Sequence, residues 1–151
     1  MGVKPPTLEE HLEIEAIKQL RVLYSQFFDS HRTDEMAMLF TEDAVCEFSD
    51  DLPYGDWVGR DEIRRQYKEV AGHSPKPFSY MHATTNGWVQ LTGPDSATGS
   101  WFLLDLGMGD NPNPVGLIGV YNDVYKKVDG EWFIHRTRID HIWTQGSAGG
   151  S

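Results

Sequence analysis

The sequence contains one cysteine, Cys46, among 151 residues. A single cysteine excludes an intramolecular disulfide and a metal site built from several thiolates, and it is compatible with a reducing compartment. No stretch approaches the roughly 18 consecutive apolar residues of a membrane span, and the first residues, M-G-V-K-P-P, lack the apolar region of a signal peptide. We therefore expect a cytoplasmic protein that has no membrane partner.

Basic residues are scarce as well. The chain has 13 Lys and Arg against 23 Asp and Glu, which gives a formal net charge of -10. Nucleic acids and anionic membranes attract proteins with a basic surface, so this balance argues against both and favours a neutral small molecule as partner. Hydrophobic residues make up 39% and aromatic residues 12% of the chain, which predicts a packed globule with enough aromatic surface to line a cavity.

Several sequence motifs of metal and cofactor chemistry are missing. None of the six histidines is separated from another by two or four positions, and no H-E-x-x-H occurs, so we expect no metal. The sequence has no G-x-S-x-G nucleophile turn, no P-loop and no G-x-G-x-x-G dinucleotide fingerprint. Acid–base chemistry without a cofactor is the prediction that remains.

The length of the chain predicts a single domain, which we place at residues 1–145. Residues 146–151 are rich in Gly and Ser, and we interpret them as a flexible tail or a cloning remnant. Three helices are predicted in the first half of the domain. Thr7 caps the first helix, whose apolar stripe has Tyr24 near its centre. The second helix is short, and the third ends at Gly72.

Strands dominate the rest of the sequence. A short strand at residues 44–49 lies between the second and third helices, and Asp129-Gly130 is a strong signal for a hairpin near the end. The four longer strands are Phe78–Leu91, Ala97–Met108, Leu117–Val128 and Glu131–Thr144. Helices followed by hairpin-linked strands predict an α+β fold, with three N-terminal helices packed on a strongly curved, mostly antiparallel sheet. We expect a cone-shaped barrel that encloses a pocket.

His82 lies in the middle of the first long strand, within S-Y-M-H-A-T-T-N-G-W-V-Q-L. Alternation along a strand puts Tyr80, Asn86 and Trp88 on the same face as His82. A face that mixes polar and aromatic side chains suits a ligand pocket, so these four are candidate pocket residues. A lone histidine on a strand is also commonly a hydrogen-bonded structural residue, and the strand alone leaves both interpretations open.

Further candidates lie on other elements. Tyr24 is either a core residue or a pocket hydroxyl. Asp105, in W-F-L-L-D-L-G, either acts as an acid with a raised pKa or caps the following loop. His141 lies on a face of the last strand that is expected to point inward. Asp29 ends the first helix, and a helical wheel directs it to solvent unless the last turn tightens and brings it inward.

The order of four segments resembles a known family. They are the helix A-I-K-Q-L-R-V-L-Y-S-Q-F-F-D, the strand Y-M-H-A-T-T-N, its partner D-S-A-T-G-S-W-F-L-L-D, and the closing hairpin Y-K-K-V-D-G-E-W-F-I. Together they resemble the SnoaL-like branch of the nuclear-transport-factor-2-like superfamily over nearly all of residues 8–144. Within that branch the pattern is most similar to the group of bile-acid 7α-dehydratase, scytalone dehydratase and hexachlorocyclohexane dehydrochlorinase. The fold hosts several reactions, so the resemblance specifies the fold better than the chemistry.

The resemblance implies a role for each candidate. His82 is expected to be the general base, and Asp29 to orient its ring and stabilise the imidazolium. Tyr24 is expected to contact a substrate oxygen, and Asp105 to be a second carboxylate in the pocket. At position 141 this chain has His where the bile-acid enzyme has Arg, which leaves the substrate and its charge open. The residues expected to bind substrate are His141, Tyr80, Trp88, Asn86 and Trp101.

These expectations describe a cofactor-independent lyase that acts by β-elimination on a medium-sized hydrophobic substrate with a hydroxyl or a ring. The alternatives are an isomerase or a polyketide-type cyclase with the same base, and a small-molecule-binding domain without turnover. We expect another copy of the chain to cover the outer sheet face, which carries Trp and Tyr of the last strands. The resemblance implies a trimer before a dimer. For an enzyme, His82 and Asp29 must lie within hydrogen-bond reach in a pocket of roughly a few hundred Å³.

Overall fold

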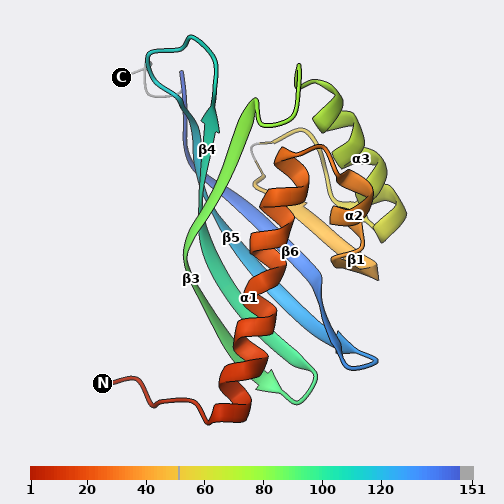
Figure 1. Ribbon diagram of the computed structural model, residues 1–151, viewed down its shortest axis with the longest axis vertical. Coiled ribbons are helices and arrows are strands. Elements are labelled where there is room, and N and C mark those ends of the chain that lie inside the picture. The colour runs from red at the N-terminus through yellow and green to blue at the C-terminus, as the bar shows by residue number, and fades with distance from the viewer. Residues whose placement is uncertain (51, 147–151) are drawn as a thin grey trace.

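The computed structural model describes residues 1–50 and 52–146, and these form three helices and six strands (Figure 1). The helices are α1 (Leu8–Asp29), α2 (Thr33–Ala37) and α3 (Arg60–Gly72). The strands are β1 (Phe40–Phe48), β2 (Trp57–Val58), β3 (Tyr80–Gly93), β4 (Ser96–Gly107), β5 (Val115–Val128) and β6 (Glu131–Thr144). No helix in this part of the chain is long and apolar enough to cross a bilayer. Most of the expected tail, residues 147–151, lies outside the described residues.

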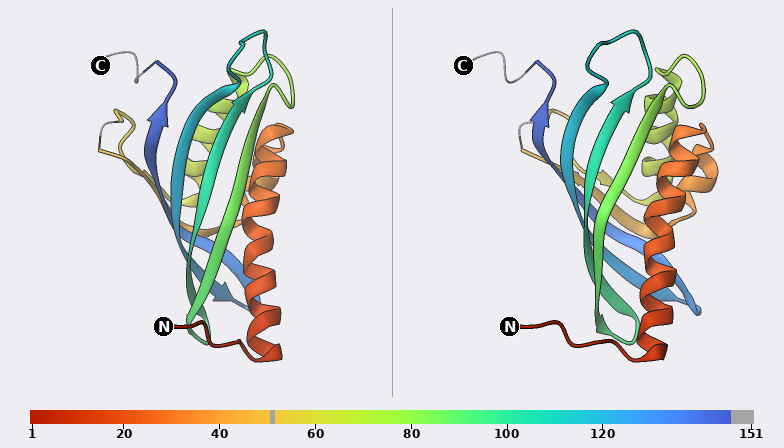
Figure 2. Two further views of the ribbon diagram at one scale, coloured as in Figure 1. Left: turned by 90° about the vertical axis from the view of Figure 1, so that its left-hand side faces the viewer. Right: turned by 60° about the vertical axis from the view of Figure 1, so that its left-hand side comes forward.

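The strands form one sheet in the order β2-β1-β6-β5-β4-β3. Neighbouring strands are antiparallel except for β1 and β6, which are parallel. All three helices lie on one side of this sheet, with α1 along β3 and with α2 and α3 over β1 (Figure 1). The long strands twist and bend as they cross the molecule (Figure 2). The predicted α+β fold, with helices packed on a curved and mostly antiparallel sheet, is confirmed.

Local sequence sets both ends of α1. The Thr7 hydroxyl accepts a hydrogen bond from the Glu10 N–H (3.2 Å), and the Glu10 carboxylate accepts one from the Thr7 N–H (3.1 Å), which is a capping box. At the other end His31 adopts the left-handed conformation with a φ of 63°. The Arg32 N–H donates to the Phe27 carbonyl (2.8 Å), which completes a Schellman motif. This motif stops α1 and turns the chain toward α2.

The buried face of α1 contains two polar residues that the apolar stripe did not predict. Arg21 is fully buried, and Asp29 is 9% exposed. Arg21 is buried because it pairs with Asp123 on the inner face of β5. Asp29 remains inside the helix, and no change of winding brings it inward. It is covered because β3 runs beside this flank of α1, so the curvature of the sheet widens the part of the helix that is shielded from water.

A bulge in β3 reverses its two faces, which alternation along the sequence did not predict. The pairing with β4 shifts by one residue between Thr85 and Trp88, and Asn86 has a φ of 53°. Beyond a bulge the side chains change sides. Gly87 therefore lies directly under the Trp101 ring, where a Cβ atom would have no room, and Trp88 is 54% exposed on the outer face. The prediction that Asn86 and Trp88 share one face with the candidate histidine is wrong.

Candidate active site

Asp29 holds His82 by two hydrogen bonds. The His82 ring nitrogen Nδ1 lies 2.6 Å from Asp29 Oδ1, and the His82 backbone N–H donates to Asp29 Oδ2 at 2.9 Å. A carboxylate accepts hydrogen bonds and does not donate them, so Nδ1 carries the proton. In the neutral ring Nε2 is then the basic nitrogen. One aspartate thus fixes both the tautomer of the ring and the strand from which the ring projects.

The segment that carries His82 is tied to the end of α1 at a third point. The Phe78 N–H donates to the backbone carbonyl of Asp29 at 2.7 Å. Phe78 has a φ of 61°, a conformation that is uncommon for a bulky residue and that a surrounding structure must hold in place. Asp29 and His82, 53 positions apart in the sequence, are therefore positioned by the backbone as well as by their side chains.

Two neighbours complete the surroundings of the His82 ring. The Phe28 ring stacks on it, with centroids 4.4 Å apart and planes 16° apart. Asp105 is the residue opposite His82 in the pairing of β3 with β4, and its Oδ2 lies 3.8 Å from Nε2. The His82 side chain is 14% exposed. The basic nitrogen thus faces a carboxyl group across a gap slightly longer than a hydrogen bond, in a site largely closed to water.

The surroundings of Asp105 change the pKa of its carboxyl group. Burial raises the pKa of Asp105 above its usual value, and the negative charge of Asp29 acts in the same direction. Interaction with His82 and with His141 opposes this shift of the pKa. A carboxyl group that retains its proton at higher pH can donate it to a leaving group, which is one of the two interpretations of Asp105 that the sequence left open.

Phe28, His82 and Asp105 line a cavity of about 550 Å³, which we call the main cavity. Its wall is largely aromatic and includes Phe28, Phe48 and Trp57. Glu69, His73, His82, Asp105 and His141 are the titratable side chains that line it besides tyrosines, and no Lys or Arg among the described residues does so. The Nδ1 atom of His141 is buried and has no hydrogen-bond partner in the same part of the chain. A cavity of this kind suits a mostly hydrophobic ligand with a few polar groups.

Asp105 also borders two neighbouring hollows. One, of about 240 Å³, lies between the ends of α1 and α3 and is lined by Asp29, His82 and Tyr80. The other, of about 750 Å³, lies beside the loop between β4 and β5 and is lined by Tyr80 and Phe78. Tyr80, which is 47% exposed, therefore lines these hollows and not the main cavity. Asp105 lines the main cavity and both hollows, whereas His82 lines the main cavity and the smaller hollow.

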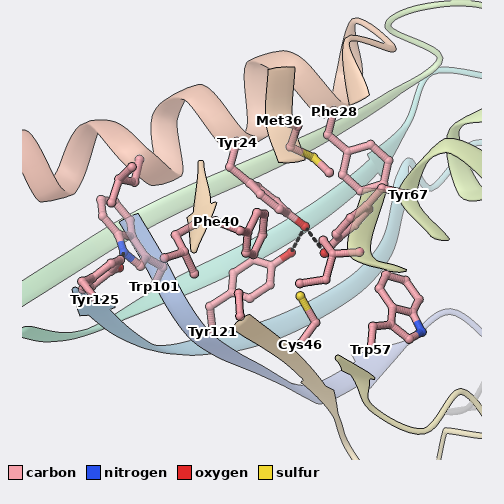
Figure 3. Close-up of a cluster of buried hydrophobic side chains, with 14 of the residues drawn as sticks. Tyr24, Phe28, Met36, Phe40, Cys46, Trp57, Tyr67, Trp101, Tyr121 and Tyr125 are labelled. Carbon is pink, nitrogen blue, oxygen red and sulfur yellow. Dashed lines mark hydrogen bonds between the residues drawn. The ribbon is translucent and has the colours of Figure 1, made fainter. Parts of the chain in front are cut away.

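Three buried tyrosines, Tyr24, Tyr67 and Tyr121, form what we call the tyrosine cluster at the inner end of the main cavity. Their hydroxyl groups point toward one another from α1, α3 and β5 (Figure 3). The Tyr24 oxygen lies 2.8 Å from that of Tyr67 and 3.5 Å from that of Tyr121. Burial raises the pKa of each of the three well above 10, so they are hydrogen-bond donors at neutral pH.

Sequence analysis placed Tyr24 in the pocket but missed Tyr67 and Tyr121. Both could have been found. Tyr67 follows Ile63 by four positions on the apolar face of α3, and Tyr121 alternates with the inward residues of β5. Trp101 was expected to bind substrate, but it lies outside the cavity because it is 7% exposed in the core, where its Nε1–H donates to the Tyr125 hydroxyl at 3.2 Å. Asn86 and Trp88 also lie outside the cavity.

A metal-binding group is not found in the described part of the chain, where no three His, Cys, Asp or Glu side chains converge suitably. Cys46, the single cysteine, is 1% exposed. Burial raises the pKa of its thiol to about 12, so the thiol is protonated and unreactive at neutral pH. The titratable side chains that line the cavity are imidazole, carboxyl and phenol groups.

The family profile described as "SnoaL-like domain" matches residues 9–138. The chain belongs to the SnoaL-like domain family. This confirms the resemblance seen in the sequence, and it accounts for the combination of a long first helix and a curved sheet around a cavity. As a SnoaL-like domain, the chain has a fold that is used for more than one reaction.

Solved structures with this SnoaL-like architecture include both enzymes and proteins of unknown function. A scytalone dehydratase-like protein of Novosphingobium aromaticivorans DSM 12444 has 25% identity and a TM-score of 0.76, over 90% of this chain and 88% of its own. Hexachlorocyclohexane dehydrochlorinase LinA-type3 of Novosphingobium barchaimii LL02 has 19% identity and a TM-score of 0.76, over 91% and 92% of the two chains. A protein of unknown function from Mycobacterium tuberculosis has 23% identity and a TM-score of 0.80, over 99% and 83%.

Proposed function

We propose that this SnoaL-like protein is a cofactor-independent lyase that eliminates water from a hydrophobic hydroxylated or cyclic substrate. The observation that carries the proposal is the pair of hydrogen bonds from His82 to Asp29. They leave Nε2 of His82 facing Asp105 in a cavity of about 550 Å³. A structural histidine would have no need of a second carboxyl group at its basic nitrogen, and the pKa of this second group, Asp105, is raised by burial. The names of the dehydratase-like and dehydrochlorinase structures agree with an elimination.

The reaction follows from the roles of the three groups. Nε2 of His82 removes a proton from the carbon next to a carbonyl, and the electrons of the C–H bond move toward the carbonyl oxygen. As they return to form the new double bond, the C–O bond to the leaving hydroxyl breaks and Asp105 donates its proton, so that water leaves. Transfer of the proton from His82 to Asp105, 3.8 Å away, restores both groups. The net change is loss of one water molecule.

Oxygen atoms of the substrate need donors in the same cavity. Tyr24 offers its hydroxyl from the inner end, and His141 offers a buried ring nitrogen without a protein partner among the described residues. We propose that Tyr24 contacts the carbonyl oxygen and that His141 contacts another oxygen of the substrate. Because the lining of this cavity includes no Lys or Arg from the described residues, a carboxylate on the substrate would have no fixed countercharge there.

A panel of cyclic β-hydroxy ketones tests the proposal. Turnover is followed by the mass of the product, because elimination lowers it by one water and isomerisation or cyclisation without loss of water leaves it unchanged. His82→Ala should abolish turnover, and it should also abolish exchange of the proton next to the carbonyl for deuterium. His135→Ala is the matched control, because His135 lies near Asp43 (3.5 Å) outside the cavity. Full activity or full exchange in His82→Ala would reject the base assignment.

We also propose that other copies of the chain cover the outer face of β3 and β4. Met81, Trp88 and Phe102 on this face are 48%, 54% and 49% exposed, and an apolar patch of this kind marks an interaction site. The tyrosines of β5 do not belong to it, because Tyr121 and Tyr125 are buried on the inner face. Light scattering should give the mass of a trimer, with a dimer as the alternative, and Phe102→Glu should dissociate it. A monomeric unmutated chain would contradict this proposal.

A further inference from the structure

We infer that the larger hollow, beside the loop between β4 and β5, holds the leaving group of the reaction. The leaving group is then not limited to a hydroxyl group, and the substrate class extends to β-alkoxy carbonyl compounds, which lose an alcohol in place of water. The inference rests on the proposed function, because it needs His82 as the base and Asp105 as the acid. It gives a role to the side chains that line this hollow, which the elimination of water does not use.

The first argument is a difference between the base and the acid. Both line the main cavity and the smaller hollow, but only Asp105 also lines the larger hollow. The side chain of Asp105 is 30% exposed, and that of His82 is 14% exposed. The oxygen that Asp105 protonates is the one that leaves, so the group attached to this oxygen lies on the side of the acid. That side borders a space of about 750 Å³, far more than one water molecule fills.

The second argument is the glycine next to Asp105 on the same face of β4. Gly107 pairs with Tyr80 as Asp105 pairs with His82, and residues two apart on a strand share a face. A Cβ atom on Gly107 would lie 3.8 Å from the Tyr80 ring and 3.9 Å from the Pro114 carbonyl oxygen, which is ordinary van der Waals contact. A side chain would therefore fit at this position, and its absence keeps the space beside Asp105 free for a ligand.

The third argument is that the walls of the larger hollow are fixed to one another. The Met108 N–H donates to the Ser79 carbonyl at 2.9 Å, and the side-chain amide of Asn111 donates to Oε1 of Gln145 at 3.0 Å. These bonds join the loop between β4 and β5 to the segment before β3 and to the residue after β6. All four residues line the hollow, so it is formed before a ligand arrives, as small-molecule sites usually are.

The lining of the larger hollow indicates which alcohols fit. Phe78, Tyr80 and Met108 are 59%, 47% and 50% exposed, and they offer apolar contact area. Lys76 is the one cation and Asp105 the one carboxyl group among the described residues that line it. Apolar walls with a few polar groups suit a hydrophobic ring, and Lys76 disfavours a positive charge on it. We therefore expect an alcohol with a hydrophobic ring and no positive charge.

The reaction balances in the same way as the loss of water. Nε2 of His82 removes the proton from the carbon next to the carbonyl. As the new carbon–carbon double bond forms, the bond between the β-carbon and the alkoxy oxygen breaks, and its electron pair stays on the oxygen. Asp105 donates its proton to this oxygen, so a neutral alcohol leaves. The proton on His82 then passes to Asp105, and the two products, a conjugated ketone and an alcohol, contain all the atoms of the substrate.

The test compares 3-hydroxy-, 3-methoxy- and 3-benzyloxycyclohexanone with the full chain. All three give cyclohex-2-enone, whose ultraviolet absorbance measures turnover above the spontaneous rate, and mass spectrometry detects the released benzyl alcohol. Water, methanol and benzyl alcohol have nearly the same acidity, so differences in rate report the fit of the leaving group. Because the benzyl ring gains apolar contacts, kcat/KM should be about tenfold higher for the benzyloxy than for the hydroxy compound.

Gly107→Leu fills the larger hollow and should remove this advantage of the benzyloxy compound, while turnover of the hydroxy compound stays within about twofold. Gly72→Leu is the matched control, because a Cβ atom on Gly72 has nothing within 4 Å and this residue lines none of the three spaces. Should Gly107→Leu not fold, Met108→Ala takes its place. It removes an apolar contact and should lower the advantage, whereas Met38→Ala, at a residue of similar exposure (51%), should not.

A binding measurement locates the benzyl group without any turnover. The His82→Ala variant, with carbon-13 in its methionine methyl groups, is titrated with 3-benzyloxycyclohexanone and followed by NMR. The signal of Met108 should shift, because its side chain lines the larger hollow. The signal of Met38, which lines none of the three spaces, should stay in place. With 3-hydroxycyclohexanone neither signal should shift.

Three results would overturn the inference. These are turnover of the hydroxy compound with slower turnover of the benzyloxy compound, an undiminished benzyloxy advantage in Gly107→Leu, and a Met108 signal that does not respond to the benzyloxy compound. The first of them would leave the proposed function intact. Absence of turnover with every ketone would instead reject the proposed function, and the Met108 signal would then decide by itself whether the larger hollow holds this group.

Discussion

Two polar clusters lie along the buried side of α1, eight residues or about 12 Å apart, and they are built in opposite ways. In the first, which we call the Arg21 cluster, Arg21 donates to both carboxylate oxygens of Asp123, at 2.9 and 2.7 Å. The hydroxyl of Tyr125 donates to the same carboxylate at 2.7 Å, and Thr137 accepts from Arg21. The carboxylate and most of the guanidinium are thus satisfied by protein groups.

The second cluster, which we call the His82 cluster, consists of Asp29, His82, Asp105 and His141. Only the link between Asp29 and His82 is a close hydrogen bond. Asp105 stays 3.8 Å from His82, and a buried nitrogen of His141 lacks a partner in the described residues. Polar groups that are paired with other protein groups stabilise the fold, whereas a buried group without a protein partner is a candidate contact for a ligand or a water molecule. The comparison predicts that mutations in the Arg21 cluster mainly lower stability, whereas mutations in the His82 cluster mainly lower activity.

The largest effect on stability is expected from Asp123→Asn. The change keeps the shape of the side chain but leaves Arg21 as a buried charge without a countercharge, which costs about 3–5 kcal/mol in the free energy of unfolding. Urea denaturation followed by circular dichroism measures it. Asp61→Asn, whose side chain is 96% exposed, is the matched control and should change stability by less than about 0.5 kcal/mol. Equal stability of the two variants would remove the contrast between the clusters.

The largest effect on activity is expected from Asp29→Asn. The ring and the backbone N–H of His82 bond to different oxygens of Asp29, and in the amide an NH₂ group replaces one of these oxygens, so one donor loses its acceptor. The ring loses its fixed tautomer, and turnover should decrease by about 10²–10³-fold. The loss of stability should be clearly smaller than that of Asp123→Asn, because no unpaired charge remains. Normal turnover in a folded Asp29→Asn protein would show that His82 works without its carboxylate.

The sequence predicted the elements of both clusters more readily than their contacts. Periodicity located α1 and the long strands, because burial of one face is a local property of the pattern. Asp29 was directed to solvent, since a helical wheel does not include the strand that runs beside the helix. Arg21 was missed for a related reason, because a charge in an apolar stripe is buried only through a partner 102 positions away. The bulge at Asn86 also depends on packing, here of Trp101 over Gly87.

Asp105→Asn should lower turnover and at the same time raise the stability of the folded chain. Burial raises the pKa of Asp105 in the folded chain, so the folded state binds more protons than the unfolded state between the two pKa values. Stability therefore decreases as pH rises from the unfolded value of about 3.9 through the raised one. The amide removes this decrease, so above the raised pKa the variant should melt at a higher temperature than the unmutated chain. Turnover should decrease by about tenfold or more, because the acid is lost.

The melting temperature is measured for both proteins from acidic to neutral pH. Below the unfolded pKa the carboxyl group is protonated in both states, so the advantage of the variant should disappear there. A variant that melts lower at neutral pH would mean that Asp105 is stabilised as a carboxylate and is not the acid.

The smallest change is expected from Thr137→Val, which tests whether the Arg21 cluster contributes to turnover. Thr137 is 4% exposed and accepts a hydrogen bond from Arg21. Valine has nearly the same shape, and Arg21 stays paired with Asp123, so the cost is about 1 kcal/mol. Turnover should not change, because Arg21, which lies against the rings of Tyr24 and Tyr121, keeps its place. A loss of turnover at unchanged substrate affinity would instead show that the orientation of Arg21 reaches the reacting oxygen through Tyr24 and Tyr121, and that the two clusters act as one site.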